Sequence, residues 1–286
     1  MPKISYVDGS YCHYENSKIN INDRGYHFGD AVYEVVMFNK NIFFDFDGHI
    51  ERLFKSLSSI DITLNFSINT LKIIIKKLIK INKASYGSVY IQVSRGIAPR
   101  NHSYNNLKIK PVLIISITEK KCDLNNKIKR VNAITLSDNR WDRPDIKTTQ
   151  LLPNILAKTK AEQNNAFESI FLDEKGFITE GSSSNIWILN YQNELITRGL
   201  DGKILSGITR STIAKFAFKN KIKLVERKFS KNELYNAKEV FLTSASSFVT
   251  QIIKIDDYLI NNGLVGDVSN NLRETYIKAN EKTVNN

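Results

Sequence analysis

A short polar segment, residues 119–127, divides this chain of 286 residues into two parts of ordinary domain size. The segment is rich in lysine, which is typical of a solvated connection between folded regions. We therefore predict an N-terminal domain over residues 1–118, a linker over residues 119–127 and a C-terminal domain over residues 128–286.

The first part alternates between patterns typical of strands and of helices. Residues 4–14 alternate around Asp8-Gly9, which predicts a β-hairpin, and residues 22–25 form a second turn signal. The helix that follows Gly48-His49 carries an apolar stripe at Ile50, Leu53, Phe54 and Leu57, and a second amphipathic helix covers 71–79. Three further segments are rich in strand-forming residues, namely 32–38, 88–94 and 112–117.

The second part is richer in strand patterns. A helix is predicted over 152–167, with Pro153 in its first turn, and two more over 207–219 and 266–282. Residues 169–179 predict a hairpin, and further strands are predicted at 130–136, 185–189, 239–243 and 249–255. The mixture of elements predicts a fold of the α/β (α+β) class.

The charge of the chain permits a nucleic acid or an anionic membrane surface as partner. The formal net charge is +12 and the sequence pI is about 9.5. The lysines, however, are scattered along the chain, and we find no basic stripe with interleaved aromatic residues. We therefore expect no nucleic-acid partner, and a non-enzymatic nucleic-acid binder remains a distant alternative.

The cysteine content and the apolar runs favour a cytoplasmic protein. Cys12 and Cys122 form no CxxC motif, and His13 beside Cys12 is not a metal-site spacing, so we expect neither a disulfide framework nor a metal. The N-terminus lacks the apolar core of a signal peptide, and no run reaches the roughly 18 apolar residues of a membrane span. We expect no membrane partner.

Arg52 is out of place in its predicted helix. It lies off the apolar stripe and near the start of the helix, where a cation is mildly unfavourable beside the helix dipole. Either it is a surface arginine or it faces an anion.

Five motifs occur in order over nearly the whole chain and resemble those of the fold-type-IV (class IV) pyridoxal-phosphate-dependent aminotransferases. That family includes D-amino-acid transaminases, branched-chain aminotransferases and aminodeoxychorismate lyases. The motifs are Arg24-Gly-Tyr-His-Phe-Gly-Asp-Ala-Val-Tyr33-Glu34, His49-Ile-Glu-Arg52-Leu, Asp145-Ile-Lys147, Thr179-Glu180-Gly-Ser-Ser-Ser-Asn185 and Ser206-Gly-Ile-Thr-Arg210.

The resemblance implies a two-domain enzyme with a smaller N-terminal α/β domain and a larger, β-rich pseudo-barrel domain that binds pyridoxal 5'-phosphate. Lys147 would be the Schiff-base lysine and proton shuttle, and Glu180 would pair with the pyridine nitrogen. Tyr33 would line the pocket opposite the lysine as a catalytic and substrate-binding residue. The other implied cofactor contacts are a phosphate contact from Arg52, packing behind the ring from Leu205, and contacts from Ile208, Thr209, Ser244 and Ala245 at two phosphate-binding turns.

The second of these turns departs from the family pattern. Many relatives have a threonine where this chain has Ala245 after Ser244, and Ala245 can donate its N–H but no hydroxyl. Residues 248–251 also lack the glutamate and proline common there. We expect these differences to affect the affinity for the cofactor.

Arg100 and His102 follow an Arg-Gly turn. This arrangement is similar to the carboxylate trap of D-amino-acid transaminases, in which such residues bind the substrate carboxylate in the active site of the neighbouring subunit. The resemblance therefore implies a homodimer that transfers an amino group between a D-amino acid, such as D-alanine, and a 2-oxo acid, such as 2-oxoglutarate, by a ping-pong mechanism. A branched-chain L-amino-acid aminotransferase or an aminodeoxychorismate lyase of the same fold remains open as an alternative.

Overall fold

The computed structural model describes residues 3–40, 42–105, 107–122, 124 and 127–282. The chain forms two compact units, which are described separately below. The first comprises Met1–Asp123 and Ile146–Gln150, and the second comprises Leu124–Asp145 and Leu151–Asn286. Residues 123, 125 and 126 of the predicted linker lie outside the described residues, and the predicted domain boundaries stay a prediction.

An antiparallel sheet of six strands forms the centre of the first unit, in the order β2-β1-β6-β5-β3-β4. The hairpin predicted around Asp8-Gly9 is confirmed, because β1 and β2 pair with Val7 opposite Ser10. The strands are β1 (Ile4–Val7), β2 (Ser10–His13), β3 (Ala31–Asn39), β4 (Ile42–Phe43), β5 (Tyr86–Ser94) and β6 (Val112–Glu119).

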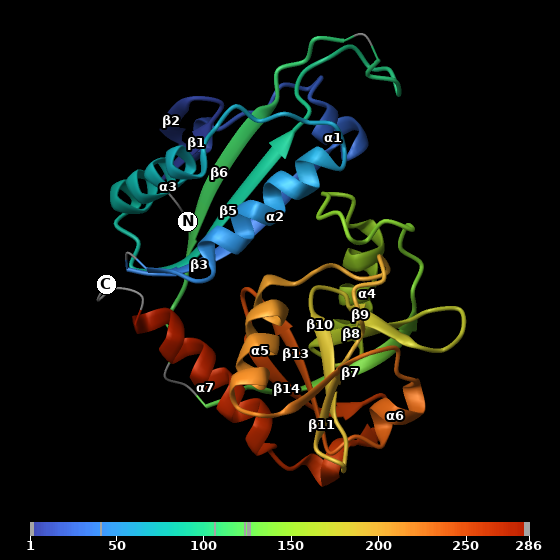
Figure 1. Ribbon diagram of the computed structural model, residues 1–286. Helices are drawn as coiled ribbons and strands as arrows, with labels where there is room; N and C mark the ends of the chain where they lie inside the picture. The colour runs from blue at the N-terminus through green and yellow to red at the C-terminus, as the bar shows by residue number, and fades with distance from the viewer. Residues whose placement is uncertain (1–2, 41, 106, 123, 125–126, 283–286) are drawn as a thin grey trace. The chain divides into compact units, whose positions relative to one another are not determined.

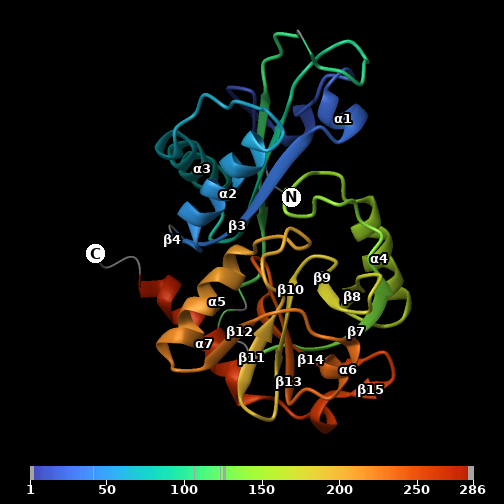
Figure 2. The ribbon, with the colours of Figure 1, turned by 45° about the vertical axis from the view of Figure 1, so that its right-hand side comes forward.

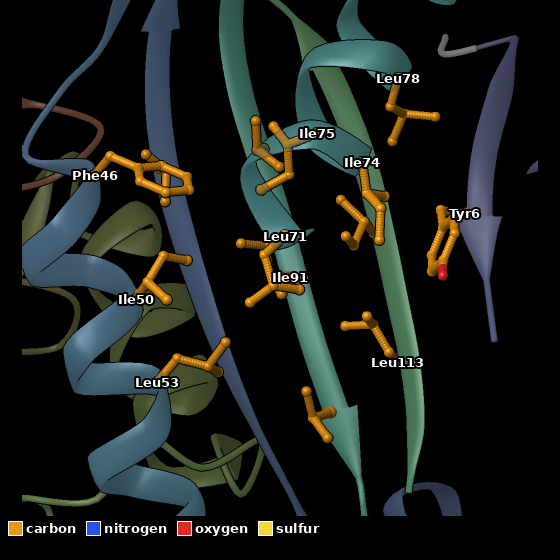
Figure 3. Packing of buried hydrophobic residues seen from close by; sticks show 14 of the residues in the cluster. Tyr6, Phe46, Ile50, Leu53, Leu71, Ile74, Ile75, Leu78, Ile91 and Leu113 are labelled. Atoms are coloured by element: carbon orange, nitrogen blue, oxygen red, sulfur yellow. The ribbon is translucent and has the colours of Figure 1, made fainter. Parts of the chain in front are cut away.

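Two helices, α2 (Phe46–Ser58) and α3 (Ile68–Asn82), cover one face of this sheet (Figure 1). The prediction that Gly48-His49 precedes this helix is wrong, because α2 begins at Phe46 and includes both residues. The apolar stripes predicted for both helices are buried against the strands, where removal of apolar surface from water stabilises the unit. Figure 3 shows this packing between α2, α3 and the sheet, with the labelled side chains Tyr6, Phe46, Ile50, Leu53, Leu71, Ile74, Ile75, Leu78, Ile91 and Leu113.

The turn predicted at residues 22–25 is the start of a short helix, α1 (Arg24–Phe28). The side chain of Asp23 accepts a hydrogen bond from the Gly25 N–H and so caps the helix. Gly29 ends the helix with a left-handed φ of 65°, a conformation that glycine adopts without steric cost.

The segment Ile146–Gln150 follows the predicted linker in sequence yet belongs to the first unit. Ile146 is buried in the core of this unit, and Thr148 forms an isolated bridge with Val32. The Tyr33 N–H also donates to the Lys147 carbonyl at 3.0 Å. The segment therefore lies alongside β3 as an additional extended stretch of chain.

A sheet of nine strands forms the second unit, with eight in the order β12-β11-β10-β13-β14-β7-β8-β9 and β15 paired with β14. Strand β9 also contacts β10, so the sheet curls back on itself like part of a barrel. This mixed α/β architecture confirms the predicted fold class. The strands are β7 (Arg130–Ser137), β8 (Glu168–Leu172), β9 (Ile178–Gly181), β10 (Asn185–Leu189), β11 (Glu194–Thr197), β12 (Lys223–Glu226), β13 (Glu239–Ser244), β14 (Phe248–Ile255) and β15 (Tyr258–Leu259).

Helices pack around this curled sheet (Figure 2). They are α4 (Leu152–Gln163), α5 (Ile208–Lys219), α6 (Lys231–Tyr235) and α7 (Asp267–Lys282). Helices α5 and α7 contact each other, α5 contacts β13 and α7 contacts β14, whereas α4 packs on β8. The prediction that the helix starting at Leu152 continues to Phe167 is wrong, because Asn165 adopts a left-handed φ of 53° and β8 begins at Glu168.

No helix in the described part of the chain has the length and apolar character that a membrane crossing requires.

Candidate active site

Lys147 is held in the first unit by its own backbone. Its carbonyl accepts from the Tyr33 N–H at 3.0 Å, and its N–H donates to the Ser56 Oγ of α2 at 3.3 Å. These bonds direct the side chain toward Tyr33, so that Lys147 Nζ lies 3.4 Å from Tyr33 Oη and 4.4 Å from the centroid of its ring. The unit thus brings together two of the predicted catalytic side chains.

Tyr90 lies beside this pair and was not anticipated from the sequence. Its ring stacks on Tyr33 with centroids 5.6 Å apart, and its hydroxyl donates to Gln92 Oε1 at 2.6 Å. Burial, with a contribution from Tyr33, raises the pKa of Tyr90 to about 12. Tyr90 therefore remains a neutral hydrogen-bond donor that fixes the ring of Tyr33.

Arg52 faces an anion, which decides between the two readings left open by its position in the helix. Its Nε and Nη2 donate to the two carboxylate oxygens of Glu34 at 2.7 and 2.9 Å, and His49 Nδ1 lies 2.8 Å from Glu34 Oε2. Burial favours the neutral acid, but Arg52 and His49 outweigh it and lower the pKa of Glu34 to about 2. The carboxylate of Glu34 therefore fixes the guanidinium of Arg52 in one orientation.

In the second unit Glu180 is buried in a cluster of donors. Arg140 Nη1 donates to Oε1, Asn185 Nδ2 donates to Oε2 at 3.0 Å, and the Leu205 N–H lies 3.2 and 3.1 Å from the two oxygens. Burial raises the pKa of Glu180 to about 6, and Arg140 restrains the rise. The carboxylate is therefore ionised at neutral pH, the state in which it can stabilise a positive charge.

Arg140 is itself oriented by a second carboxylate. Its Nε and Nη2 donate to Asp138 at 2.9 and 2.7 Å, and the Thr179 hydroxyl donates to the same carboxylate at 2.7 Å. A guanidinium held in this bidentate manner can present its remaining N–H group to Glu180 with little loss of rotational freedom.

The N-terminus of α5 has the features of an anion site. Gly207 occupies the cap position and has no side chain to satisfy the first-turn N–H groups, which include those of Ile208 and Thr209. The Thr209 Oγ1 is buried and has no hydrogen-bond partner among the described residues. Such a helix start favours a negatively charged group.

Asn185 links this helix start to Glu180. Its Nδ2 donates both to Glu180 and to the Leu205 carbonyl at 3.0 Å, and a Cβ on Gly207 would lie 2.0 Å from its Oδ1. The backbone of the half-buried Leu205 is therefore held beside the Glu180 carboxylate.

Ser244 ends β13, and Ala245 begins the turn that follows. The Ser247 N–H donates to Ser244 Oγ at 3.2 Å, and Arg273 of α7 donates to the carbonyls of Ser247 and Val249, each at 3.2 Å. Phe248 has a left-handed φ of 56°, which is strained for a bulky residue. Strain of this kind often occurs at functional turns, and here Arg273 and the burial of Phe248 hold it.

Arg100 and His102 are exposed on the loop between β5 and β6. The guanidinium carbon of Arg100 lies 5.3 Å from the centroid of the Phe28 ring, and the His102 ring lies 5.4 Å from the same ring. The two predicted trap residues therefore share one aromatic neighbour in the first unit.

Sequence reasoning missed three residues of these clusters. Arg140 and Tyr90 lie outside the recognised motifs, and their contacts depend on distant strands. Asn185 ends a recognised motif, and its position as a polar first residue of the buried strand β10 is the signal that could have identified it.

Known proteins resemble this chain over most of its length. The family model for amino-transferase class IV matches residues 31–255. D-alanine aminotransferase of Bacillus licheniformis is 39% identical over 93% of this chain and 94% of its own length. D-alanine aminotransferase of Staphylococcus aureus (strain N315) is 37% identical over 97% of this chain and 98% of its own length.

Solved structures share the fold. The branched-chain amino acid aminotransferase of Escherichia coli matches with a TM-score of 0.87 and 21% identity over 97% of this chain and 94% of its own. That of Thermobaculum terrenum, in its PLP form, matches with a TM-score of 0.84 and 23% identity over 98% of this chain and 94% of its own. The family model and the curated relatives, taken with the two clusters around Lys147 and Glu180, show that this chain belongs to the class IV aminotransferases.

Proposed function

We propose that this protein is a D-amino-acid transaminase that moves the amino group of D-alanine to a 2-oxo acid such as 2-oxoglutarate. The observation that carries the proposal is the position of Lys147 Nζ, 3.4 Å from Tyr33 Oη, in a chain whose curated relatives are D-alanine aminotransferases. A lysine amine beside a phenol is suited to accept and return a proton.

The residues present fit pyridoxal phosphate. The Thr209 hydroxyl, which has no partner in the described part of the chain, and the N-terminus of α5 suit a phosphate group. The ionised Glu180 suits a protonated pyridine nitrogen. Arg52, Ser244 and the Ala245 N–H are the further phosphate contacts in this proposal. When bound, the cofactor supplies an electron-accepting ring and an aldehyde carbon.

The side chains of this protein then have separate tasks. The amine of Lys147 would move a proton from the α-carbon of the amino acid to the aldehyde carbon of the bound cofactor, while Tyr33 Oη orients that amine. Glu180 would hold the proton on the pyridine nitrogen, and Arg140 and Asn185 keep the carboxylate of Glu180 ionised and in place. Leu205 would pack against the ring and exclude water from it.

Arg100 and His102 bind the substrate carboxylate in this proposal. A carboxylate that leaves water needs charge-assisted donors, and Arg100 can supply two N–H groups and His102 one. Their exposure in the single chain is in keeping with a homodimer in which this loop completes the active site of the partner. Sedimentation with activity measured on dilution tests the dimer, which a fully active monomer would contradict.

We also propose a cytoplasmic location, which fits the free thiols of Cys12 and Cys122. Fractionation of cells that produce the protein, with an antibody or tag as probe, tests it.

A substrate panel tests the function itself. The purified protein, loaded with pyridoxal phosphate, is incubated with D- and L-amino acids and 2-oxoglutarate, and the keto acids are measured. D-alanine should outperform every L-amino acid, and Arg100→Ala should raise its KM by about tenfold or more, the value of a hydrogen bond to a charged group. Faster turnover of L-leucine or L-isoleucine would instead identify the branched-chain type.

A further inference from the structure

Among the described residues, backbone hydrogen bonds tie the loop that carries Arg100 and His102 to α1 and the residues just before it only at the base of the loop. The Arg24 N–H donates to the Gly96 carbonyl at 2.9 Å, and the Ala98 N–H donates to the Asn22 carbonyl at 3.2 Å. Beyond Ala98 the backbone N–H groups of the described loop residues make only local bonds, such as that from Leu107 to the Tyr104 carbonyl at 3.2 Å. The tip of the loop therefore needs support from side chains.

The side chain of Arg24 supplies that support. Its Nη1 donates to the Asn101 carbonyl at 2.5 Å and its Nη2 donates to the His102 carbonyl at 3.0 Å. Its Nε donates to Asp30 Oδ2 at 2.8 Å, and the side chain is 3% exposed. One planar guanidinium therefore holds two consecutive backbone carbonyls of the loop, those of Asn101 and His102.

Arg24 shares its carboxylate partner with a second buried arginine, so it also needs these two carbonyl acceptors. Asp30 Oδ2 also accepts from Arg95 Nε at 2.7 Å, so one carboxylate serves two buried guanidiniums. Arg95 directs its other N–H groups to the carbonyls of Ile60 and Asp61, at 2.6 and 3.1 Å. If the loop moved away, Arg24 would be left with unpaired buried donors, which is costly for a charged group.

Phe28 orients the two side chains that the loop presents. Its ring lies 4.8 Å from the guanidinium carbon of Arg24, 5.3 Å from that of Arg100 and 5.4 Å from the ring of His102. A cation over an aromatic face is attracted by its quadrupole, and a tilted ring pair adds contact area. The backbone and the side chains of the loop are thus fixed by two residues of the same short helix.

We infer that Arg24 and Phe28 are positioning residues that hold Arg100 and His102 in the geometry needed to bind the substrate carboxylate. The inference rests on the proposed function, because it assumes that these two residues bind substrate. It assigns to α1 a role in substrate affinity without direct contact with the substrate.

Arg24→Lys is the decisive variant, because a lysine keeps the charge but cannot reach Asp30 and both carbonyls at once. The KM of the holoenzyme for D-alanine should rise by about tenfold, the factor that corresponds to the loss of one charge-assisted hydrogen bond. The kcat and the cofactor absorbance should stay near those of the parent. Tryptic cleavage after the exposed Arg100 should accelerate, because the backbone of the loop is no longer held.

Arg95→Lys is the matched control. It removes a buried guanidinium from the same Asp30 but leaves the Asn101 and His102 carbonyls bound, and a lysine can still place a cation near the Tyr104 ring. It should lower the unfolding temperature by a similar amount and leave the KM unchanged. Equal effects of the two variants on KM would show that Arg24 acts only through stability and would overturn the inference.

Combination with Arg100→Ala separates the inference from the proposed function. If Arg24 acts through the loop, Arg24→Lys should add little to the KM of Arg100→Ala. A normal KM in Arg100→Ala would refute the carboxylate trap, and tryptic cleavage after Arg100 in Arg24→Lys would then still report whether Arg24 holds the loop. A raised KM in Arg100→Ala with a normal KM and a normal rate of cleavage in Arg24→Lys would refute the inference alone.

Phe28 provides a second variant in case Arg24→Lys does not fold. Phe28→Leu should raise the KM several-fold, and Phe28→Tyr, which keeps the ring, should restore it. Equal KM values in Phe28→Leu and the parent would contradict the role of Phe28.

Discussion

Arg140 donates a hydrogen bond to the buried carboxylate of Glu180, although the two residues are separated by forty positions in the chain. The carboxylate lies where burial favours the neutral acid, and Arg140 is the charge that opposes this tendency. The ionisation of Glu180 at neutral pH therefore depends on a residue outside every recognised motif.

Replacement of Arg140 should move the acid limit of activity upward. In Arg140→Gln the pKa of Glu180 should rise above its present value of about 6, because one positive charge near a carboxylate shifts its pKa by about 1–3 units. Activity requires the ionised form, so it is lost as the pH falls through this pKa. The pH profile of kcat/KM measures the shift.

Glu180→Gln is the control for that experiment. It should bind the cofactor but react more slowly, because its barrier rises by several kcal/mol and each 1.4 kcal/mol lowers the rate roughly tenfold. Its pH profile should also lack the fall in activity on the acid side. An unchanged acid limb in Arg140→Gln would show that another group sets the pH limit.

Lys147→Ala should abolish transamination, because no other lysine amine is held beside Tyr33 Oη in the described part of the chain. Borohydride reduction of the parent holoenzyme, followed by peptide mapping, should place the cofactor on Lys147. Attachment to a different lysine would refute the assignment.

Glu34→Gln should destabilise the first unit in a pH-dependent manner. The pKa of Glu34 is lowered to about 2, so its ionised form stabilises the fold above pH 4.5 and this contribution is lost as the pH falls toward 2. At pH 7 Glu34→Gln should lower the free energy of unfolding by about 3 kcal/mol, since each unit of pKa shift corresponds to about 1.36 kcal/mol. Denaturant unfolding of both proteins from pH 7 to pH 3 measures it, and the difference between them should shrink in acid.

Gly207→Ala should weaken cofactor binding. A Cβ at Gly207 would lie 2.0 Å from Asn185 Oδ1, so Asn185 would have to move from the position in which it binds Glu180 and the Leu205 carbonyl. Cofactor titration should show a dissociation constant raised by about tenfold, the equivalent of one buried hydrogen bond.

Gly199→Ala is the matched control, since the atom nearest to its added Cβ lies at 3.6 Å, an ordinary contact distance. It should bind the cofactor as the parent does. Equal affinity in both variants would show that the packing of Asn185 against Gly207 does not matter for binding.

The sequence by itself determined the local elements and the identity of the main site residues. The hairpin at Asp8-Gly9 and the stripes of α2 and α3 follow from side-chain periods of two and 3.6 residues, which are properties of the local chain. Lys147 and Glu180 were identified because each lies in a recognisable motif. The short parallel pair β11 and β12 and the helix α6 were not predicted.

Only the tertiary structure decided how these residues are supported. Lys147 joins the first unit because Thr148 pairs with Val32. Arg140, after the end of β7, meets Glu180 of β9, and Arg24 reaches a loop 77 and 78 positions further along. The physical reason is that buried charges must find partners wherever the closed chain brings donors and acceptors together. That pairing depends on the path of the whole backbone, which no local pattern of residues encodes.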